Sequence, residues 1–257
     1  MSRQTMHLNL FPLGCGHHQA AWRHPESSVE QLGDIRFHEN LARLAERGKM
    51  DAVFLADGSA AQDVAEGPRW FLEPLTCLAA MARATSHIGL ICTVSSTFFT
   101  PFHAARMLAS LDHISGGRIG WNVVTSMFDA EARNHGYTSM PDHASRYARA
   151  AEFVDVVLAL WDSWDQDALL LDRNGQYADP DKVRAIHHHG SHFLVDGPLT
   201  VPRPPQGHPV LFQAGASEHG RDLAARRAEA IYAVANDLEA AQAYYRDIRQ
   251  RVRQAGR

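Results

Sequence analysis

Polar side chains recur near the ends of several apolar segments of the sequence. Asp57 closes the segment AVFLAD, and Thr93 lies near the end of IGLICTVS. Asn122 follows Trp121 inside the apolar run RIGWNVVT. A buried amide needs a hydrogen-bond partner, and it can both donate and accept. These positions predict a polar site where several strands end, although each residue alone can equally satisfy neighbouring backbone or cap a turn.

The stretch QAGASEHG, residues 213–220, has features of an anion site. Gly215 permits a tight turn and a close backbone approach, and Ser217 lies where a helix should begin. The start of a helix offers free N–H groups and the positive end of the helix dipole, which suit a phosphate. An ordinary helix cap is the alternative, and this stretch alone does not decide between the two.

His143 and Tyr147 are four residues apart at the start of a predicted helix. This spacing places both side chains on one helix face. If a phosphate lies over the preceding loop, both can donate hydrogen bonds to it. The alternative is a pair of side chains that bond each other within the scaffold.

His17 and His18 are the candidates for proton transfer or substrate contact. They lie in GHHQAAWRHP, after the first apolar segment. An imidazole titrates near neutral pH, so it can move a proton there. Two exposed loop histidines are the alternative.

A second histidine-rich stretch, HHHGSH, covers residues 187–192. Adjacent histidines cannot all turn to one ion, and no carboxylate lies at a ligand spacing such as HExxH. We therefore predict a solvated or lid loop and no metal site at His187, His188, His189 and His192. A metal-dependent barrel hydrolase remains an alternative class of enzyme.

Composition bounds the class of protein. The 257 residues are 45% hydrophobic and 21% charged, with a formal net charge of -4, which predicts one globular domain. The sequence has no long run of one charge sign, so it lacks the electrostatic signal of a protein that binds nucleic acid or an anionic membrane. We therefore expect a small-molecule partner. The 3 cysteines have no CxxC spacing, which fits a reducing compartment better than a set of disulfides. The sequence contains neither an 18-residue apolar run nor the apolar core of a signal peptide. We expect a cytoplasmic protein.

Apolar strands alternate with amphipathic helices along the chain. Strands are predicted over 6–13, 52–57, 88–95, 118–125, 210–214 and 230–234, and helices over 35–48, 72–85, 101–115, 144–164, 217–227 and 237–254. Near-continuous apolar strands predict a parallel sheet, in either an open doubly wound fold or a (β/α)8 barrel. No GxGxxG follows the first strand, which favours the barrel. The barrel has six βα units, two short of eight, and 165–209 is expected to be an irregular insertion before the fifth strand.

Longer segments carry a resemblance to a known family. They are SGGRIGWNVVTS, SRYARAAEFVDVVLALWDSW, GHHQAAWRHP and the run from HFLVDG to EAIYA, which together span most of the chain. They resemble the nitrilotriacetate and dibenzothiophene-sulfone monooxygenases, a branch of the bacterial-luciferase-like flavin enzymes. The resemblance implies a TIM barrel that binds reduced FMN, supplied by a separate NAD(P)H:flavin reductase. It also implies that O2 is used to oxidise a small organic substrate containing nitrogen or sulfur.

The resemblance also implies roles for the polar residues. His143, Tyr147 and Ser217 would hold the phosphate and ribityl end of the flavin. Asp57, Thr93 and Asn122 would lie nearer the isoalloxazine ring. A deazaflavin in the same barrel is an alternative cofactor.

Members of this family continue beyond the position of Arg257. The sequence therefore predicts an incomplete barrel, a truncated or split member that is open between its first and sixth strands. Unpaired edges favour pairing with another chain, as a homodimer or with a complementing chain. A non-catalytic flavin-binding remnant or subunit is the alternative to an active monooxygenase.

Overall fold

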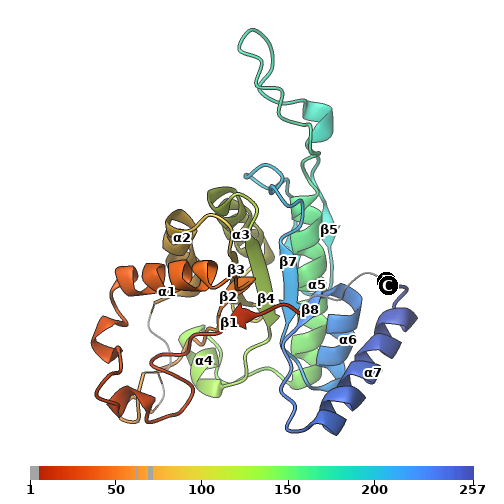
Figure 1. Cartoon of the computed structure of the whole chain (residues 1–257). Coiled ribbons are helices and arrows are strands. Elements are labelled where there is room, and N and C mark those ends of the chain that lie inside the picture. The colour runs from red at the N-terminus through yellow and green to blue at the C-terminus, as the bar shows by residue number, and fades with distance from the viewer. Residues whose placement is uncertain (1–5, 62, 69–71) are drawn as a thin grey trace, which may run out of the picture.

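The computed structural model describes residues 6–61, 63–68 and 72–257. Its main sheet is curled (Figure 1) and has six parallel strands, ordered β1 (Asn9–Leu10), β2 (Ala52–Leu55), β3 (Gly89–Ser95), β4 (Ile119–Val124), β7 (Val210–Gln213) and β8 (Ala230–Ile231). Each strand falls inside a predicted segment, and β1 and β8 are shorter than expected. The predicted barrel-type fold with six βα units is confirmed.

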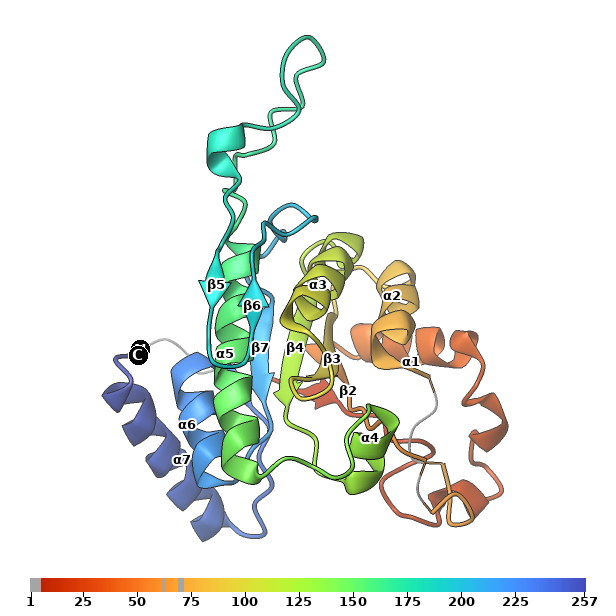
Figure 2. The same ribbon diagram turned by 180° about the vertical axis from the view of Figure 1, so that it is seen from behind.

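Helices surround this sheet on its outer side, except for the short α4 (Asp129–Asn134), which lies past the carboxyl ends of the strands (Figure 2). The other helices are α1 (Ile35–Arg47), α2 (Pro74–Ala84), α3 (Pro101–Ser115), α5 (His143–Trp161), α6 (Glu218–Arg227) and α7 (Leu238–Gln254). Pro74 and Pro101 open their helices, where the fixed φ of proline suits the first turn. Side chains of Asp142 and Ser217 cap α5 and α6 by accepting backbone N–H groups. Among these helices, the short α4 was not predicted.

The main core lies between the sheet and the helices. Trp121 of β4 is fully buried, and its ring lies 5.9 Å from that of Phe153 and 6.1 Å from that of Trp161. Both partners belong to α5, so this aromatic cluster fixes α5 against β4. The start of α5 is thereby held at the carboxyl end of the strand.

The inner face of the sheet carries a second, smaller group of rings. Phe54 and Phe212 lie 6.2 Å apart across the curl, and a Cβ on Gly120 would lie 2.9 Å from the ring of Phe212 and 3.0 Å from Ile91. Phe11 follows β1 and Tyr232 follows β8, and their rings lie 5.6 Å apart. The curl therefore brings the two edges of the sheet near each other, as in a barrel.

Strand register places the central polar residues. Thr93 of β3 is paired with Asn122 of β4. Their neighbours Cys92 and Trp121 belong to the core under the helices. Because side chains alternate along a strand, Thr93 and Asn122 face the inside of the curl.

The segment between α5 and β7 is not wholly irregular. It contains the antiparallel pair β5 (His188–His189) and β6 (Leu194–Val195), beside α5 in Figure 2, and the 3₁₀ helix η3 (Pro180–Lys182). Its outer part projects away from the rest of the chain (Figure 1). No helix in the described ranges combines the length and the apolar composition needed to cross a bilayer.

Candidate functional site

A pocket of about 440 Å³ opens beyond the carboxyl ends of β2, β4 and β7. We call it the carboxyl-edge pocket; its lining comes from residues 57–60 and 124–131, the start of α5, and the loop 214–217. Active sites of βα barrels lie at this end of the strands. The volume lies in the range of about 300–1,000 Å³ that is usual for small-molecule sites. The pocket brings together the predicted site residues Asp57, His143, Tyr147 and Ser217.

One end of the pocket is built around the start of α6. Ser217 Oγ accepts a hydrogen bond of 3.2 Å from the N–H of Gly220. A Cβ on Gly215 would lie 3.0 Å from the Cα of Gly220, and one on Gly220 would lie 3.1 Å from Tyr147 Oη. The two glycines therefore let the loop, the helix start and Tyr147 approach closely. The first N–H groups of α6 are available at this point.

Aromatic donors converge on the same end. The ring of His143 lies 4.7 Å from that of Tyr147 and 5.3 Å from that of His219, in the first turn of α6. His219 was not singled out from the sequence, although it lies inside the stretch QAGASEHG. Two imidazoles and a phenol can each donate a hydrogen bond to an anion.

Arg146 adds a cation to the pocket, where its guanidinium lies against the segment after β4. It lines the pocket, and its guanidinium donates hydrogen bonds to the backbone carbonyls of Ser126 and of Thr125, the latter at 3.4 Å. Its Nε is buried without a hydrogen-bond partner among the described residues. Sequence reasoning missed Arg146, although it lies three residues after His143 and thus on the same helix face.

The opposite end of the pocket is acidic. Glu131 is buried, and its Oε2 accepts hydrogen bonds from the N–H groups of Met127 at 3.2 Å and Phe128 at 3.1 Å. Its Oε1 accepts from the N–H of Ser59 at 3.3 Å. Glu131 therefore ties the segment after β2 to the segment after β4. An acidic residue at the third position of a helix is a capping signal, but the short α4 was not predicted.

Asp57 lines the pocket and lies close enough to Glu131 for the two carboxyl groups to interact. Burial raises the pKa of its carboxyl, and the nearby carboxylates Glu73 and Glu131 raise the pKa further. The N–H of Gly58 acts in the opposite direction. Asp57 therefore holds a proton at a higher pH than an exposed aspartate does.

Thr93 and Asn122 are not among the residues that line this pocket; they are buried side by side on the adjacent strands β3 and β4. Asn122 Nδ2 donates to Thr93 Oγ1 at 3.0 Å, and Thr93 Oγ1 donates to the carbonyl of Leu55 at 2.9 Å. These two bonds fix the orientation of the amide. Its Oδ1 is buried and has no partner in the described part of the chain. Because buried polar groups are normally paired, this oxygen is suited to a donor from a ligand.

His17 and His18 belong to a different pocket. They line a cavity of about 310 Å³ together with Trp22 and Glu66. His17 Nε2 lies 3.3 Å from the carbonyl of Phe11, and His18 Nδ1 accepts from the N–H of Ala20. The structure does not place these histidines among the groups of the carboxyl-edge pocket.

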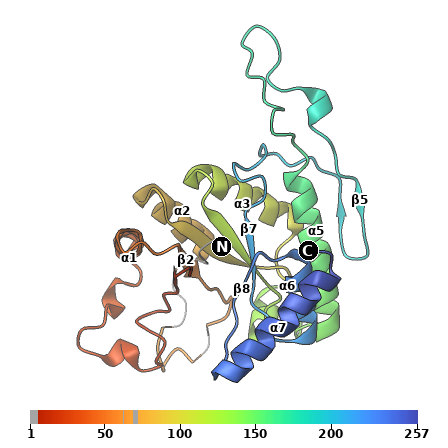
Figure 3. The same cartoon turned by 45° about the vertical axis from the view of Figure 1, so that its right-hand side comes forward.

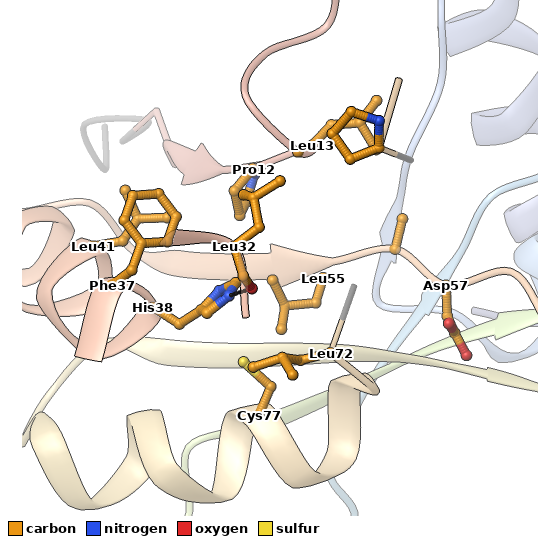
Figure 4. Close-up of a pocket in the computed structure, with 13 residues that line it drawn as sticks. Pro12, Leu13, Leu32, Phe37, His38, Leu41, Leu55, Asp57, Leu72 and Cys77 are labelled. Carbon is orange, nitrogen blue, oxygen red and sulfur yellow. Dashed lines mark hydrogen bonds between the residues drawn. The ribbon is translucent and has the colours of Figure 1, made fainter. Parts of the chain in front are cut away.

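A small apolar cavity lies between the two pockets. Its volume is about 60 Å³, and Figure 4 shows side chains from α1, α2 and β2 around it. Leu13 also lines the pocket of His17 and His18, whereas Asp57 also lines the carboxyl-edge pocket. The two larger pockets are therefore neighbours across a thin apolar region.

The second histidine-rich stretch has a structural partner. His188 Nε2 lies 3.0 Å from Glu152 Oε1 on α5, and Glu152 also accepts from the backbone N–H groups of His192 and Phe193. Glu152 therefore holds the turn between β5 and β6 on α5. Within the described ranges, no three His, Cys, Asp or Glu side chains are grouped to hold a metal ion. The metal-dependent hydrolase gains no support from this geometry.

Comparison with known proteins identifies the family. The sequence model described as luciferase-like monooxygenase matches residues 11–257. The chain belongs to this family, and the resemblance seen in the sequence is confirmed. It is 46% identical to nitrilotriacetate monooxygenase component A of Aminobacter aminovorans, over 100% of this chain and 60% of that protein.

Other relatives agree with this assignment. The chain is 46% identical to dibenzothiophene-sulfone monooxygenase of Rhodococcus erythropolis (strain XP), over 99% of this chain and 59% of the relative. A crystal structure of riboflavin lyase with modified FMN and riboflavin superposes with a TM-score of 0.93 at 35% identity, covering 99% of this chain and 60% of that one. The chain thus spans about 60% of the length of these relatives.

Proposed function

We propose that this chain binds reduced FMN in the carboxyl-edge pocket and acts in the O2-dependent oxidation of a small organic substrate containing nitrogen or sulfur. The observation that carries the proposal is that His143, Tyr147 and Ser217 line one pocket beside the start of α6, together with the cation Arg146. A cation, neutral donors and a helix start together suit a phosphate. Membership of the luciferase-like family and the modified FMN in the related riboflavin lyase structure support a flavin as the cofactor.

The residues of the pocket fit the two ends of a flavin. Ser217, His143 and Tyr147 would hold the phosphate and ribityl chain, and Arg146 would balance the phosphate charge. The flavin, when bound, supplies the redox chemistry with O2. The protein supplies binding, orientation and exclusion of water.

Residues of the strands would contact the isoalloxazine ring of the flavin. Asn122 Oδ1 offers a hydrogen-bond acceptor. The amide cannot turn over to present its NH2 group instead, because Nδ2 donates to Thr93. Asp57 can hold a proton near the ring because burial raises the pKa of its carboxyl. We assign proton transfer or substrate contact to His17 and His18 in the adjoining pocket.

The partners follow from the same proposal. One nitrilotriacetate relative is named component A, which indicates an enzyme with a further component. We propose a flavin reductase as the supplier of reduced FMN, and a cytoplasmic setting. We treat residues 1–257 as one barrel domain with 165–209 as an insertion. A second copy or a complementing chain would cover the open edges of the sheet at β1 and β8.

An anaerobic titration with reduced FMN tests the cofactor assignment. We expect saturable binding that His143→Ala and Ser217→Ala each weaken about 3- to 10-fold, the loss of one hydrogen bond. His87→Ala and Ser86→Ala are the controls, because both residues are exposed in the turn before β3, at the opposite end of the strands. Absence of binding, or equal losses in the controls, would contradict the assignment. Tighter binding of a reduced deazaflavin would favour that cofactor instead.

A turnover assay then separates an oxygenase from a flavin-binding remnant. The chain is mixed with a flavin reductase, NAD(P)H and O2, and candidate amines, sulfones and sulfides are screened for oxidised product. Product that depends on the chain supports the proposal. Tight FMN binding without any oxidised product, also after addition of the remaining family segment as a second chain, supports the non-catalytic alternative.

A further inference from the structure

The loop between β7 and α6 is tied to α7. The carbonyl of Gly215 accepts a hydrogen bond from the phenol of Tyr244 on α7, at 3.3 Å. The carbonyl of Ala216 accepts from Arg221 Nε at 2.9 Å. Two successive peptide groups of the loop are therefore anchored by side chains that lie outside the proposed flavin contacts.

The two anchoring side chains also hold each other. The guanidinium of Arg221 lies 5.1 Å from the centroid of the Tyr244 ring, and its Nη1 pairs with Asp247 Oδ2 at 3.0 Å. Asp247 Oδ1 pairs in turn with Arg251 Nε at 3.0 Å, and Arg251 also pairs with Glu218. Figure 3 shows α6 and α7, the two helices that carry these side chains, side by side.

The direction of these two carbonyls fixes the direction of two donors. In a trans peptide the C=O and the N–H point in opposite directions. Anchoring the carbonyl of Gly215 toward Tyr244 and that of Ala216 toward Arg221 therefore turns the N–H groups of Ala216 and Ser217 to the other side. A flip of the Gly215–Ala216 peptide, which glycine makes easy, would reverse one of them. A carbonyl oxygen would then face any bound phosphate and repel it.

We propose that Tyr244 and Arg221 are positioning residues that keep the 214–217 loop in its anion-binding orientation. This inference rests on the proposed function, because it concerns the phosphate of the same flavin. Burial raises the pKa of the Tyr244 phenol, so the side chain remains a donor at neutral pH. Neither residue needs to touch the flavin, since each acts through a backbone carbonyl.

The test compares a flavin that has the phosphate with one that lacks it. Tyr244→Phe keeps the ring beneath Arg221 and removes only the donor to Gly215. We expect it to weaken reduced FMN about 3- to 10-fold, the loss of one hydrogen bond, and to change the affinity for reduced riboflavin less than about twofold. Tyr245→Phe is the matched control, because Tyr245 is the next residue and its side chain is exposed.

A second variant tests the same inference at Arg221, in case Tyr244→Phe does not fold. Arg221→Lys keeps a cation beside Asp247 and loses the planar Nε–H donor to Ala216, so it should show the same selective loss for FMN. Equal losses for FMN and riboflavin, or no loss in either variant, overturn the inference. Failure of the unaltered chain to bind either flavin contradicts the proposed function and this inference with it. Thermal unfolding of each variant shows whether the fold is intact.

Discussion

The carboxyl-edge pocket and the pocket of His17 and His18 are built in different ways. The first takes its polar groups from strand ends and helix starts, such as Asp57 after β2 and Ser217 before α6. The second lies in the long loop after β1. It is held by contacts between distant segments, such as Trp22 Nε1 donating to the carbonyl of Glu66 at 2.6 Å. Regular elements therefore position the first pocket, and loop packing positions the second.

This difference suggests a division of labour between the two pockets. A cofactor that every turnover reuses needs a rigid site, and parallel strand register supplies one. A substrate site that differs among relatives can be carried by a loop. We therefore expect substitutions in the carboxyl-edge pocket to change flavin binding, and substitutions around His17 to change the reaction.

The largest effect is expected from Arg146→Ala. The variant removes the cation that lines the carboxyl-edge pocket, so under the proposed function reduced FMN should bind about 10- to 100-fold more weakly. Riboflavin, which has no phosphate, should lose only a few-fold, and isothermal titration calorimetry measures both. Arg226→Ala, an exposed arginine on α6, should leave both affinities unchanged.

Arg146 also donates to the carbonyls of Thr125 and Ser126, so its removal can disturb the loop after β4. Equal losses for FMN and riboflavin would show that Arg146 only holds this loop. The phosphate would then have to be assigned to other groups.

The next effect concerns the buried pair of Thr93 and Asn122 on the strands β3 and β4. Thr93→Val keeps the shape of the side chain but removes the hydroxyl between Asn122 and Leu55. We expect a loss of about 1–3 kcal/mol in the free energy of unfolding, because the buried amide and carbonyl lose their partner. Urea unfolding measures the loss. Thr138→Val, at an exposed threonine, should change little, and an unchanged Thr93→Val variant would mean that the amide is not locked.

The sequence predicts the parts of this site that follow from periodicity. Alternating apolar strands and amphipathic helices fix which residues lie at the carboxyl ends of the strands, so Asp57 and Ser217 were found at the pocket. The helical spacing of His143 and Tyr147 likewise predicts that the two side chains lie on the same face of α5. Arg146 obeys the same spacing and was missed because a helical arginine is usually an exposed surface residue.

Other features depend on contacts that no local pattern contains. Glu131 joins two loops through backbone N–H groups of Ser59 and Phe128, and Tyr244 reaches Gly215 from another helix. Such pairs are set by tertiary packing. The location of His18 apart from the carboxyl-edge pocket follows in the same way from the path of a long loop.

Asp57 gives a pH dependence of stability with a definite sign. Because its folded-state pKa is raised, the stabilisation it contributes is fully present below the ordinary aspartate pKa and is lost as pH rises through the folded value. Asp57→Asn removes this loss. The variant should be more stable than the unaltered chain at neutral pH, and the advantage should shrink as pH falls through that window. Urea unfolding across the same pH range measures it.

Asp142→Asn is the matched comparison, because the pKa of Asp142 is lowered whereas that of Asp57 is raised. The hydrogen bond from Ser145 lowers the pKa of Asp142, so its stabilisation is present above the ordinary aspartate pKa and is lost as pH falls through the folded value. Asparagine also caps helices well, so the cost at neutral pH should be small. If Asp57→Asn behaves like Asp142→Asn, Asp57 is not the proton-holding group of the pocket.

The smallest effect on cofactor binding is expected from His17→Ala and His18→Ala. Both residues lie in the neighbouring pocket and share no hydrogen-bond partner with the phosphate end in the described residues. Separate sites act additively to within about 0.5 kcal/mol, so each variant should bind reduced FMN within about twofold of the unaltered chain. Product formation with a reductase should nevertheless fall, if these histidines move a proton or contact the substrate. A large loss of FMN affinity in either variant would show that the two pockets act as one site, and that the loop after β1 closes over the flavin.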